Sequence, residues 1–504
     1  MKRQIRRRYL WNPYGLRLNI INWINMRRRH KARSSRRHKK DGIDRISTFP
    51  DHVLGNILSL LSLKDAIRTS ILSSRWRYLW TLSMSLDLTL FENEGLEKFE
   101  SFVNYVLDNC KSMNLDKFHL HCPEAVGFSL INGWVSSAIS RNPKQLDLYI
   151  DFEELEDCYD DNPEAVPLPP YPNCILNYNN LVVLKLKSCF EVEIPSSVSC
   201  FPCLKTLTFT GWYPYHSSVV NRLISSCPVL EILRVVGSCE PDEPLLFDIS
   251  NITVKKLYLD FNTGERGLHQ HFVIINTPNL EYLNIKDQTL ACYVVNNVDS
   301  VISAYIDCQG PFGRDADTKQ VVRLFLLLES VAKAKQLTLS ADSLLILKPT
   351  FCCTWPIFIN LTNLQLNASE CFDWTLLAYF LKSSPNLERL GLGKDLFSRE
   401  YQFEDQFKWN PPDDIPECLK LKLKYVEMTM FKGRNDELQL VEYLLNNAQV
   451  LEVMFIITYP YPLKDEMVEK VDMFERASQA CNVYVVEEMR RKLSKKDLEE
   501  LFDI

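Results

Sequence analysis

The chain has 504 residues, of which 46% are hydrophobic and 24% charged, so it has room for several domains or one long repeat array. Only 15 glycines are present and no Gly-x4-Gly-Lys-Ser/Thr run occurs, which excludes the usual phosphate-binding loop. No uninterrupted apolar stretch approaches the ~20 residues of a membrane-spanning helix, so no membrane partner is expected. The 16 cysteines lack a compact disulfide spacing and no cleavable leader is evident, which predicts the nucleus and/or the cytoplasm.

Basic residues are concentrated at the N-terminus. Residues 1–40 contain 15 Lys or Arg and no acidic residue, whereas the remainder has 43 basic against 64 acidic residues. The stretch from Arg27 to Lys40 has the charge density of a nuclear-import signal, which would make an importin a partner, or of a phosphate-binding arm. Nucleic acid is nevertheless not an expected partner. Contact with the acidic body, an organelle transit peptide and a disordered tail over residues 1–41 remain alternatives.

Residues 49–80 are predicted to form three short helices. Pro50 fits the first turn of the first helix, because its φ is fixed and its missing N–H is not needed there. Ser62, three residues before Asp65, is placed to cap the second helix. Trp76 and Trp80 then lie four residues apart on one side of the third. A unit this small cannot bury so much apolar surface by itself, so it needs cover from the rest of the chain or from a partner.

This pattern resembles the F-box, to which we assign residues 42–90. The resemblance implies a Skp-type adaptor as partner, with the Phe49-Pro50 pair as the entering anchor, although F-boxes usually have Leu where Phe49 stands. A helical hairpin that packs only on the next domain is the alternative. The residues implied to form or support the adaptor interface are Phe49, Pro50, Leu54, Ile57, Leu58, Leu61, Leu63, Ile67, Leu72, Trp76 and Trp80.

A Leu-x-x-Leu-x-Leu template, with conservative replacements, recurs at intervals of 21 to 38 residues after the third helix. Each copy predicts one short strand with alternate side chains in the core, and the strands stack in parallel on a concave face. Helical runs at residues 219–227 and 374–383 end just before Pro228 and Pro385, since proline removes a donor and disfavours helix before it. The copies begin at Leu115, Pro143, Leu181, Leu204, Leu230, Val254, Leu280, Val301, Ala334, Leu361, Leu387, Leu423 and Leu451.

Three of these copies, SCPVLEIL, NTPNLEYL and SSPNLERL, look like the leucine-rich repeats that follow plant F-boxes. The inward Asn or Cys position of such repeats is irregular in this chain, so we expect an uneven horseshoe over residues 91–404.

A second resemblance lies in residues 405–486. Trp409-Asn-Pro-Pro, Ile415-Pro-Glu-Cys-Leu, and the segments 423–433, 441–456 and 474–486 are together similar to the FBD domain of plant F-box proteins. The same residues predict a strand, a helix, a strand, a short helix and a last strand, which would cap the open end of the repeats. Residues 487–504 are predicted to be a helical tail. The expected fold class is α/β: a short all-α three-helix F-box, an irregular leucine-rich-repeat solenoid and an α/β FBD domain.

Candidates for catalytic, metal or cofactor chemistry are few. Cys200-Phe-Pro-Cys203 has redox spacing, but it falls in the turn before a predicted strand. The histidines of segments 119–122 and 269–271 could share a strand face, yet neither pair has a second ligand pair at zinc-finger spacing. The acidic run 153–161 is typical of a solvated loop. We therefore predict no catalytic residue, no metal, no cofactor and no enzyme activity of the chain's own.

The architecture resembles a substrate receptor of a Skp-cullin-F-box ubiquitin ligase. The F-box would hold the adaptor and, through it, a cullin and a RING protein, while the repeats and the FBD domain recruit a target protein. Such a receptor raises the local concentration of target lysines and lowers no chemical barrier itself. The aromatic residues suggested as target anchors, with core or capping roles as the alternative, are Trp212, Tyr213, Tyr215, Trp355 and Trp374.

Two other functions fit the same sequence. The chain could be a scaffold that binds the adaptor, or other proteins through its repeats, without assembling a ligase. It could also be a receptor whose target site is completed by a small molecule. An anionic ligand would need several basic side chains on adjacent strands, for which Lys185, Lys187, Lys205 and Arg234 are candidates.

Overall fold

The computed structural model divides into two compact units. The N-terminal unit runs to Leu120 and includes residues 140–143, and the second unit contains residues 121–139 and all residues from 144 onwards. No helix within the described ranges is long and apolar enough to cross a membrane. The residues that the structure describes are 46, 48–90, 95–123, 126–151, 173–176, 178–187, 201–212, 217–238, 246–261, 272–288, 290–309, 318–347, 354–368, 374–394, 409, 411–458 and 465–487.

Several sequence predictions fall outside these ranges. They are the basic segment from Arg27 to Lys40, the acidic run 153–161, the histidines of segment 269–271, Tyr213 and Tyr215, and residues 488–504 of the predicted tail.

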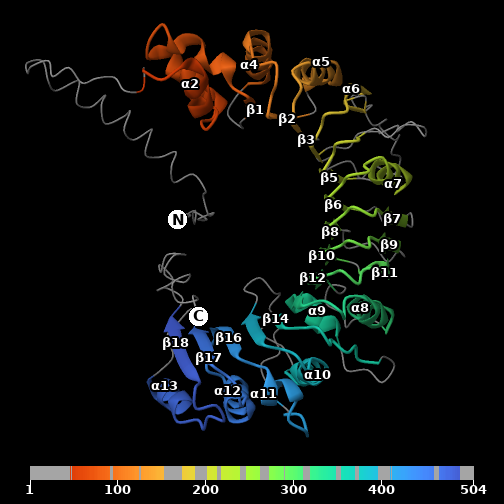
Figure 1. Cartoon of the computed structure of the whole chain (residues 1–504), viewed down its shortest axis with the longest axis vertical. Helices are drawn as coiled ribbons and strands as arrows, with labels where there is room; N and C mark the ends of the chain where they lie inside the picture. The colour runs from red at the N-terminus through yellow and green to blue at the C-terminus, as the bar shows by residue number, and fades with distance from the viewer. Residues whose placement is uncertain are drawn as a thin grey trace, which may run out of the picture. The chain divides into compact units, whose positions relative to one another are not determined.

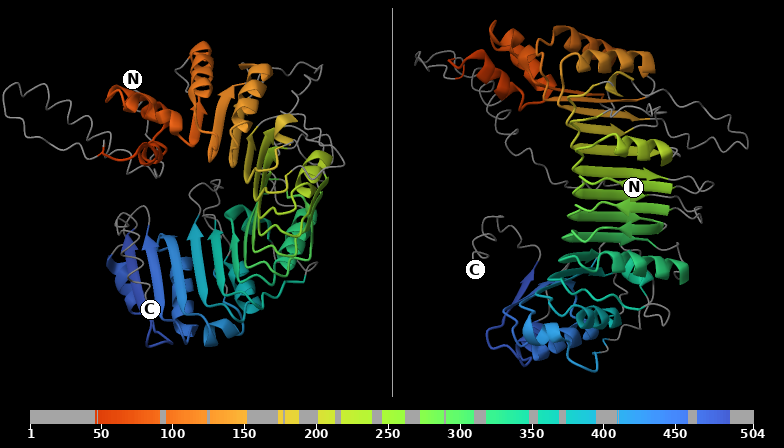
Figure 2. Two further views of the ribbon diagram at one scale, coloured as in Figure 1. Left: turned by 45° about the horizontal axis from the view of Figure 1, so that its top comes forward. Right: turned by 45° about the vertical axis from the view of Figure 1, so that its right-hand side comes forward.

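The N-terminal unit is built from short helices that pack beside the first strands (Figures 1 and 2). The predicted third helix is a 3₁₀ helix rather than an α-helix, and both of its indoles are buried. The elements are α2 (Asp51–Leu58), α3 (Leu63–Arg68), the 3₁₀ helices η1 (Thr69–Ile71) and η2 (Trp76–Leu82), β1 (Ser85–Thr89), α4 (Leu96–Asn109) and the first residues of β2 (Lys117–Pro123).

One face of α4 closes the core of this unit. Phe99, Val103 and Val106 recur at helical spacing and are all buried. On another side of the helix, the ring of Tyr105 lies 5.8 Å from the Trp80 indole. The inner face of the predicted F-box therefore shares a core with the elements that follow it in the chain.

The second unit contains a long parallel sheet. Every one of the thirteen template copies begins two residues before a strand, counting the copy that precedes β2, which confirms the repeat prediction. Along this unit the strands follow the order β3 (Gln145–Asp151), β4 (Val183–Lys187), β5 (Thr206–Trp212), β6 (Ile232–Ser238), β8 (Lys256–Phe261), β10 (Tyr282–Asp287), β12 (Ser303–Cys308), β13 (Gln336–Leu339), β14 (Asn363–Ala368), β15 (Arg389–Lys394), β16 (Tyr425–Phe431), β17 (Val453–Thr458) and β18 (Asn482–Glu487).

In-register pairing stacks the template leucines of neighbouring strands. Leu257 pairs with Leu233 on one side and with Leu283 on the other, and all three are completely buried. Asparagines tie successive repeats together just before the strands. Asn279 and Asn386 each donate from the side-chain amide to a backbone carbonyl of the preceding repeat, at 2.7 and 2.9 Å.

Among the described elements, helices and a second sheet lie over one face of the long sheet, and none of them lies over the other face, which we call the solvent face (Figure 2). The three-stranded sheet β11-β9-β7 was not predicted, because its strands carry no leucine template. The order β16, α12, β17, α13, β18 confirms the elements predicted for the FBD resemblance. The covering elements are α5 (Phe128–Ile139), α6 (Asn173–Leu176), α7 (Ser217–Ser225), β7 (Leu246–Ser250), β9 (Phe272–Asn276), β11 (Cys292–Asn296), α8 (Thr318–Ser330), α9 (Ala341–Ile346), α10 (Thr375–Ser383), α11 (Glu417–Leu421), α12 (Asn435–Asn447) and α13 (Asp465–Asp472).

Candidate functional site

The first helix of the N-terminal unit begins at Pro50. This residue is the N-cap of α2 rather than its first helical residue, and its carbonyl accepts hydrogen bonds from the backbone N–H groups of Val53 and Leu54 at 3.0 and 3.1 Å. Proline suits this position because it has no N–H that would need a partner. The preceding Phe49 lies outside the helix with 46% of its surface exposed.

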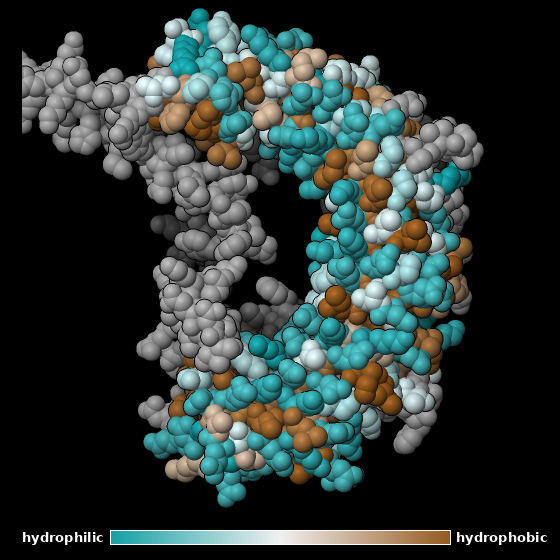
Figure 3. Space-filling view, viewed as in Figure 1, coloured by the Kyte–Doolittle hydropathy of each residue, from teal (hydrophilic) through white to brown (hydrophobic). Residues whose placement is uncertain are grey.

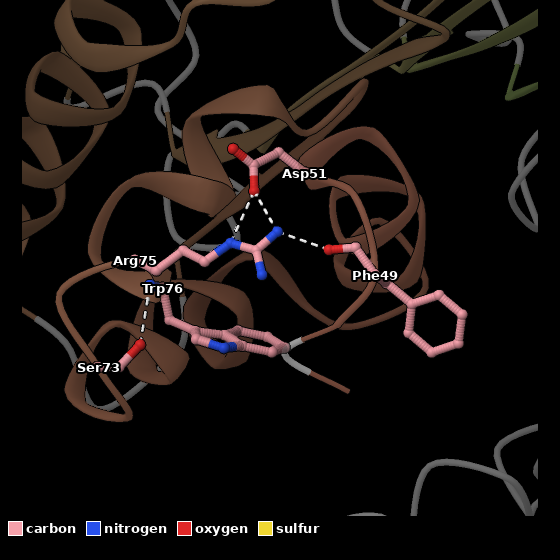
Figure 4. A network of polar contacts seen from close by, with 5 residues as sticks. All are labelled: Phe49, Asp51, Ser73, Arg75 and Trp76. Atoms are coloured by element: carbon pink, nitrogen blue, oxygen red, sulfur yellow. Dashed lines mark hydrogen bonds and ion pairs between the residues drawn. The ribbon is translucent and has the colours of Figure 1, made fainter. Parts of the chain in front are cut away.

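Arg75 fixes the start of α2 against the third helix (Figure 4). Its Nε and Nη2 atoms donate to Oδ1 of Asp51 at 2.9 and 2.7 Å, and Nη2 also donates to the carbonyl oxygen of Phe49 at 2.5 Å. The phenyl ring of Phe49 points away from this network in Figure 4. The contacts hold the backbone of the predicted anchor while leaving its side chain available. Sequence reasoning missed this role, because 24 residues separate Arg75 from Asp51.

Ser62 caps α3 as predicted. Its hydroxyl accepts a hydrogen bond from the backbone N–H of Asp65 at 3.1 Å and donates to Oδ2 of the same residue at 2.8 Å. Asp65 also accepts from Arg68 at 2.9 Å, so charges of the favourable sign stand at each end of the helix. The cap turns α3 so that Leu63 and Ala66 face the core.

The residues implied for the adaptor interface separate into two groups by burial. Leu54, Leu58, Leu63, Trp76 and Trp80 are each at most 8% exposed, so they hold the helices together and present no surface to a partner in this structure. The other six have side chains at or near the surface. Phe49, Pro50, Ile57 and Leu72 are exposed, and Leu61 and Ile67 are half-buried.

Additional large apolar side chains reach the surface of the same unit (Figure 3). Eight of the 25 large apolar side chains that are exposed among the described residues lie between residues 46 and 82. The most exposed are Leu60, Ile71 and Tyr78, at 72, 74 and 58%. Sequence reasoning missed all three, because each lies outside the helical periodicity that marks the core. We call Phe49, Ile57, Leu60, Ile71, Leu72 and Tyr78 the F-box surface.

The solvent face of the long sheet is polar and aromatic in regular rows. The Arg234 guanidinium lies 4.2 Å from the centroid of the Tyr258 ring, and Tyr258 lies 5.2 Å from Tyr282. At the other end of the sheet, Phe455 and Tyr484 stack at 5.1 Å. These side chains therefore form cation–π and ring–ring contacts with one another across neighbouring strands.

Comparison with known families agrees with the three parts of this fold. The F-box domain family matches residues 46–87, the LRR repeats described for FBD-associated F-box protein At5g56370 match residues 131–304, and the FBD family matches residues 410–456. F-box/FBD/LRR-repeat protein At2g04230 of Arabidopsis thaliana is 30% identical over 453 residues, which cover 87% of this chain and 93% of the relative. The chain belongs to the F-box/FBD/LRR-repeat proteins.

Other relatives extend over most of their length as well. F-box/FBD/LRR-repeat protein At5g22660 is 28% identical over 472 residues, covering 89% of this chain and 98% of the relative. FBD-associated F-box protein At5g56370 is 28% identical over 414 residues, covering 82 and 90%. Both are from Arabidopsis thaliana. This combination of domains is that of an adaptor-type, generally non-catalytic protein that mediates protein interactions, and the F-box generally binds Skp-type adaptors.

The aromatic residues suggested as target anchors have different positions in this F-box protein. Trp374 is buried, and its indole N–H donates to Oδ2 of Asp436 at 3.0 Å. The half-buried Trp355 contacts the Phe380 ring edge-on at 5.0 Å and donates to the Ser383 hydroxyl at 3.1 Å. These are core and capping roles, because both indoles are held by the chain itself. Trp212 lies at the end of β5.

Of the four basic side chains suggested for an anionic ligand, Lys185 and Lys187 are alternate residues of β4, Arg234 lies in β6 and Lys205 lies outside the strands. Lys185 and Arg234 lie in the same row of the sheet, with Thr208 between them. Lys205 instead precedes β5 and pairs with Glu231 at 3.1 Å, which lowers the pKa of that carboxyl.

Four cysteines of the described segments are buried and have raised pKa values. Burial raises the pKa of Cys418 to about 12 and also raises the pKa of the Cys110, Cys308 and Cys481 thiols, which makes them poor nucleophiles.

The described residues of the predicted histidine and CxxC segments are His119, His121, Cys122 and Cys203. Within the described segments, no group of three His, Cys, Asp or Glu is placed to hold a metal ion. His119 lies 4.0 Å from Asp87, and the His121 ring lies 5.9 Å from Tyr149. Cys203 is exposed, and Cys200 lies outside the described residues.

Proposed function

We propose that this chain is the substrate-recognition subunit of a ubiquitin ligase of the Skp-cullin-F-box type. The observation that carries the proposal is the F-box surface. Six large apolar side chains are exposed on one small unit, while Leu54, Leu58, Leu63, Trp76 and Trp80 form its core. An apolar patch of this kind on a soluble domain is typical of a protein-binding site. A Skp-type adaptor is the partner that the F-box match supports.

The proposed mechanism is positional. The adaptor would connect the F-box surface to a cullin and a RING protein, while the repeats and the FBD domain hold the target. Tethering of this kind raises the effective concentration of target lysines near a charged ubiquitin-conjugating enzyme. No side chain of this chain has to take part in bond making.

The test compares adaptor binding by the full chain and by a variant of the F-box surface. In Ile71→Asp/Leu72→Asp, two carboxylates replace exposed apolar groups, so the core of the unit should keep its packing. We expect affinity for a purified Skp-type adaptor to fall at least about 30-fold, because central apolar contacts dominate such interfaces. The matched control is Ser74→Asp, which adds a carboxylate at an exposed neighbouring position. Unchanged affinity of the double variant would contradict the proposal.

Cullin binding separates a ligase subunit from a scaffold. The full chain, purified with its adaptor, should retain a cullin and its RING protein. Across the variants, the amount of cullin retained should be proportional to the amount of adaptor retained. Adaptor binding without any cullin would instead identify a scaffold. Targets would be the proteins that accumulate in cells with Ile71→Asp/Leu72→Asp. Point substitutions suit this assay better than deletion of the F-box, because α3 packs on β1 and the two share a core.

We further propose that the protein acts in the nucleus and/or the cytoplasm. The basic segment from Arg27 to Lys40 supports import, since such a run can bind an importin. A fluorescent fusion lacking residues 1–40 tests this proposal. We expect loss of nuclear signal, and an unchanged distribution would remove the role of this segment in import.

A further inference from the structure

Basic side chains gather on the solvent face of the sheet at strands β4, β5 and β6. Leu184, Leu207 and Leu233 of these strands are buried, so the residues next to them along each strand point to the opposite, solvent face. On that face, long cationic side chains of β4 and β6 flank short hydroxyl side chains of β5. The residues are Lys185, Lys187, Thr208, Thr210 and Arg234, which we call the basic cluster.

The register of the strands places a threonine between two cations. Thr208 pairs with Lys185 on one side and with Arg234 on the other. Neighbouring strands lie about 4.8 Å apart, so the backbones of the two basic residues are about 10 Å apart. Both side chains are long enough to reach a group that lies above Thr208. The hydroxyl of this half-buried threonine can donate a hydrogen bond to the same group.

The neighbouring Tyr258 ring orients the exposed Arg234 side chain. The guanidinium lies 4.2 Å from the centroid of this ring. Stacking of this kind occupies the flat face of the guanidinium and leaves the N–H groups in its plane, where they can donate to a carboxylate or a phosphate. Burial raises the pKa of the nearby Asp260 carboxyl, and Arg234 opposes that rise by Coulomb attraction. Arg234 is therefore held in place by a contact that does not use its hydrogen-bond donors.

Positive charge exceeds negative charge around the basic cluster. In the solvent-facing rows that begin at Gln145, Asp147 and Tyr149, strands β3 to β8 present four basic side chains and two acidic ones, Asp147 and Asp260. Asp147 is 2% exposed and lies 4.0 Å from the Lys185 ammonium, so it offsets part of that charge. The whole chain has a formal net charge of -6. The local excess of positive charge complements an anionic partner.

A similar pair at the other end of the sheet lacks this excess. Arg389 lies 5.2 Å from the centroid of the Tyr425 ring, in an arrangement like that of Arg234 and Tyr258. The Tyr425 hydroxyl, however, donates to Oε2 of Glu427 at 3.0 Å, so a carboxylate stands beside this arginine and tyrosine pair. The pair at β15 and β16 is therefore a poorer site for an anion.

We propose that the basic cluster binds an anionic side chain of the target protein, either a carboxylate or a phosphate group. The anion lies above Thr208, between Lys185 and Arg234. This inference rests on the proposed function, because it names the chemistry of the target that the repeats hold. Strands β4 and β6 contribute the positive charges, and β5 contributes the hydroxyl donors.

Photo-crosslinking of the full chain with three synthetic peptides tests this chemistry. Each peptide contains p-benzoylphenylalanine between two identical residues, which are phosphoserine, aspartate or serine. We expect the two anionic peptides to label residues 183–187, 206–212 and 232–238 at least about tenfold more than the serine peptide, because hydrogen bonds to charged groups are the stronger ones. Counting these segments alone excludes contacts with the basic residues 1–40.

The three peptides also distinguish the two sources of negative charge. Labelling of the three segments by either anionic peptide supports the proposal, and the stronger label identifies the preferred group. Equal labelling by the serine peptide would overturn the proposal, as would labelling by the anionic peptides only at other segments.

Thr208→Asp tests the position of the anion. The substitution places a carboxylate of the chain itself between Lys185 and Arg234, so labelling by the anionic peptides should fall at least about tenfold. The matched control is Thr338→Asp, because Thr338 is half-buried in the same row of the sheet, in β13. Equal labelling of the two variants would show that the anion does not lie above Thr208.

Arg234→Gln tests the charge of the cluster without adding a carboxylate. We expect labelling to fall about fivefold, because one cation is lost. Arg389→Gln is the matched control, since it removes an arginine that also lies beside a tyrosine ring. Equal labelling of the two variants would contradict the assignment of Arg234.

Adaptor binding separates this inference from the proposed function. Thr208→Asp and Arg234→Gln should bind a purified Skp-type adaptor as well as the unmodified chain does. If the unmodified chain is labelled as expected but binds no adaptor, the proposed function fails and the anion site remains. If the chain binds the adaptor but neither anionic peptide labels the three segments, the anion site alone is overturned.

Discussion

Leucine residues of the repeat sheet and leucine residues of the F-box lie in opposite environments. Leu233, Leu257 and Leu283 stack across three strands and are inaccessible to solvent. Leu60 and Leu72 of the F-box are 72 and 54% exposed, although the same unit also contains fully buried leucines. These repeat leucines are therefore covered within the chain, whereas the F-box leaves part of its apolar surface outside the core.

This difference shows that the apolar content of a segment does not reveal how much of its apolar surface is exposed to solvent. Apolar residues in the repeats account for stability, because removing them from water is the main gain of folding. The exposed apolar residues of the F-box contribute less to that gain in the isolated chain, and an exposed apolar patch of this kind is typical of a protein-binding surface. The solvent face of the sheet bears polar and aromatic residues that contact one another. A target that binds there would therefore meet side chains that already have partners within the sheet.

The largest expected effect is the difference in unfolding free energy between a Leu→Ala substitution at a buried position and the same substitution at an exposed position. Leu283→Ala in the sheet should lower the free energy of unfolding by about 3 kcal/mol, because it leaves a cavity in a closed core. Leu60→Ala should change it by less than about 0.5 kcal/mol, since the side chain is already solvated. Chemical denaturation of both variants measures the difference. Similar losses for the two would mean that the F-box surface is part of a core.

Arg75→Ala tests how the F-box anchor is positioned. The substitution removes the hydrogen bonds to Asp51 and to the Phe49 carbonyl, so we expect a loss of about 1 kcal/mol in stability. Adaptor affinity should fall about fivefold, because Phe49 is then less well ordered. The control is Arg77→Ala, which removes a neighbouring exposed arginine. Equal affinities of the Arg75 and Arg77 variants would show that Arg75 does not position the anchor.

Ser62→Ala tests the internal structure of the F-box independently of any partner. The substitution removes the cap of α3 and should lower stability by about 1 kcal/mol. Ser62→Asp should retain most of the stability, because a carboxylate also caps a helix. Thermal unfolding of both variants checks this, and equal losses would show that the cap contributes nothing.

The smallest effect concerns the solvent face of the sheet. Burial raises the pKa of the Asp260 carboxyl, with Asp307 adding to the shift and Lys286 and Arg234 opposing it. The ionised carboxylate is therefore less favourable in the folded state, and this cost is absent at pH values below the unfolded-state pKa and present above the folded-state pKa. Asp260→Asn should stabilise the chain at pH 7 by less than about 1 kcal/mol, because the site is partly solvated.

Melting temperatures at two pH values check that prediction. The difference between Asp260→Asn and the unmodified chain should disappear near about pH 3, where the carboxyl is largely protonated in both states. A stabilisation that is the same at both pH values would assign the effect to a cause other than ionisation.

The repeat strands could be predicted because their periodicity is local. Leucines at the first, fourth and sixth template positions require one strand per copy, and even the weak copies at Pro143 and Ala334 precede strands. The strands β7, β9 and β11 were missed, because Phe247-Asp-Ile249 and similar short alternations also occur in loops. Their pairing depends on how successive repeats stack, which a single repeat does not encode.

The F-box surface was only partly predictable for a related reason. Helical spacing identifies apolar residues such as Leu54 and Leu58, but it does not say whether the chain or a partner covers them. Burial depends on the packing of η2 and α4, which are distant in sequence from α2. Residues at helix ends, such as Leu60 and Ile71, do not enter the periodic pattern at all, although the structure exposes them most.

The most direct test of the central claim is covalent footprinting of the full chain with and without a purified Skp-type adaptor. Side chains of the F-box surface should lose most of their reactivity when the adaptor binds, with Leu60, Ile71 and Tyr78 changing most. Exposed apolar residues of the second sheet, such as Phe272 and Val294, should react as before. Unchanged reactivity of the F-box surface at saturating adaptor would contradict the account.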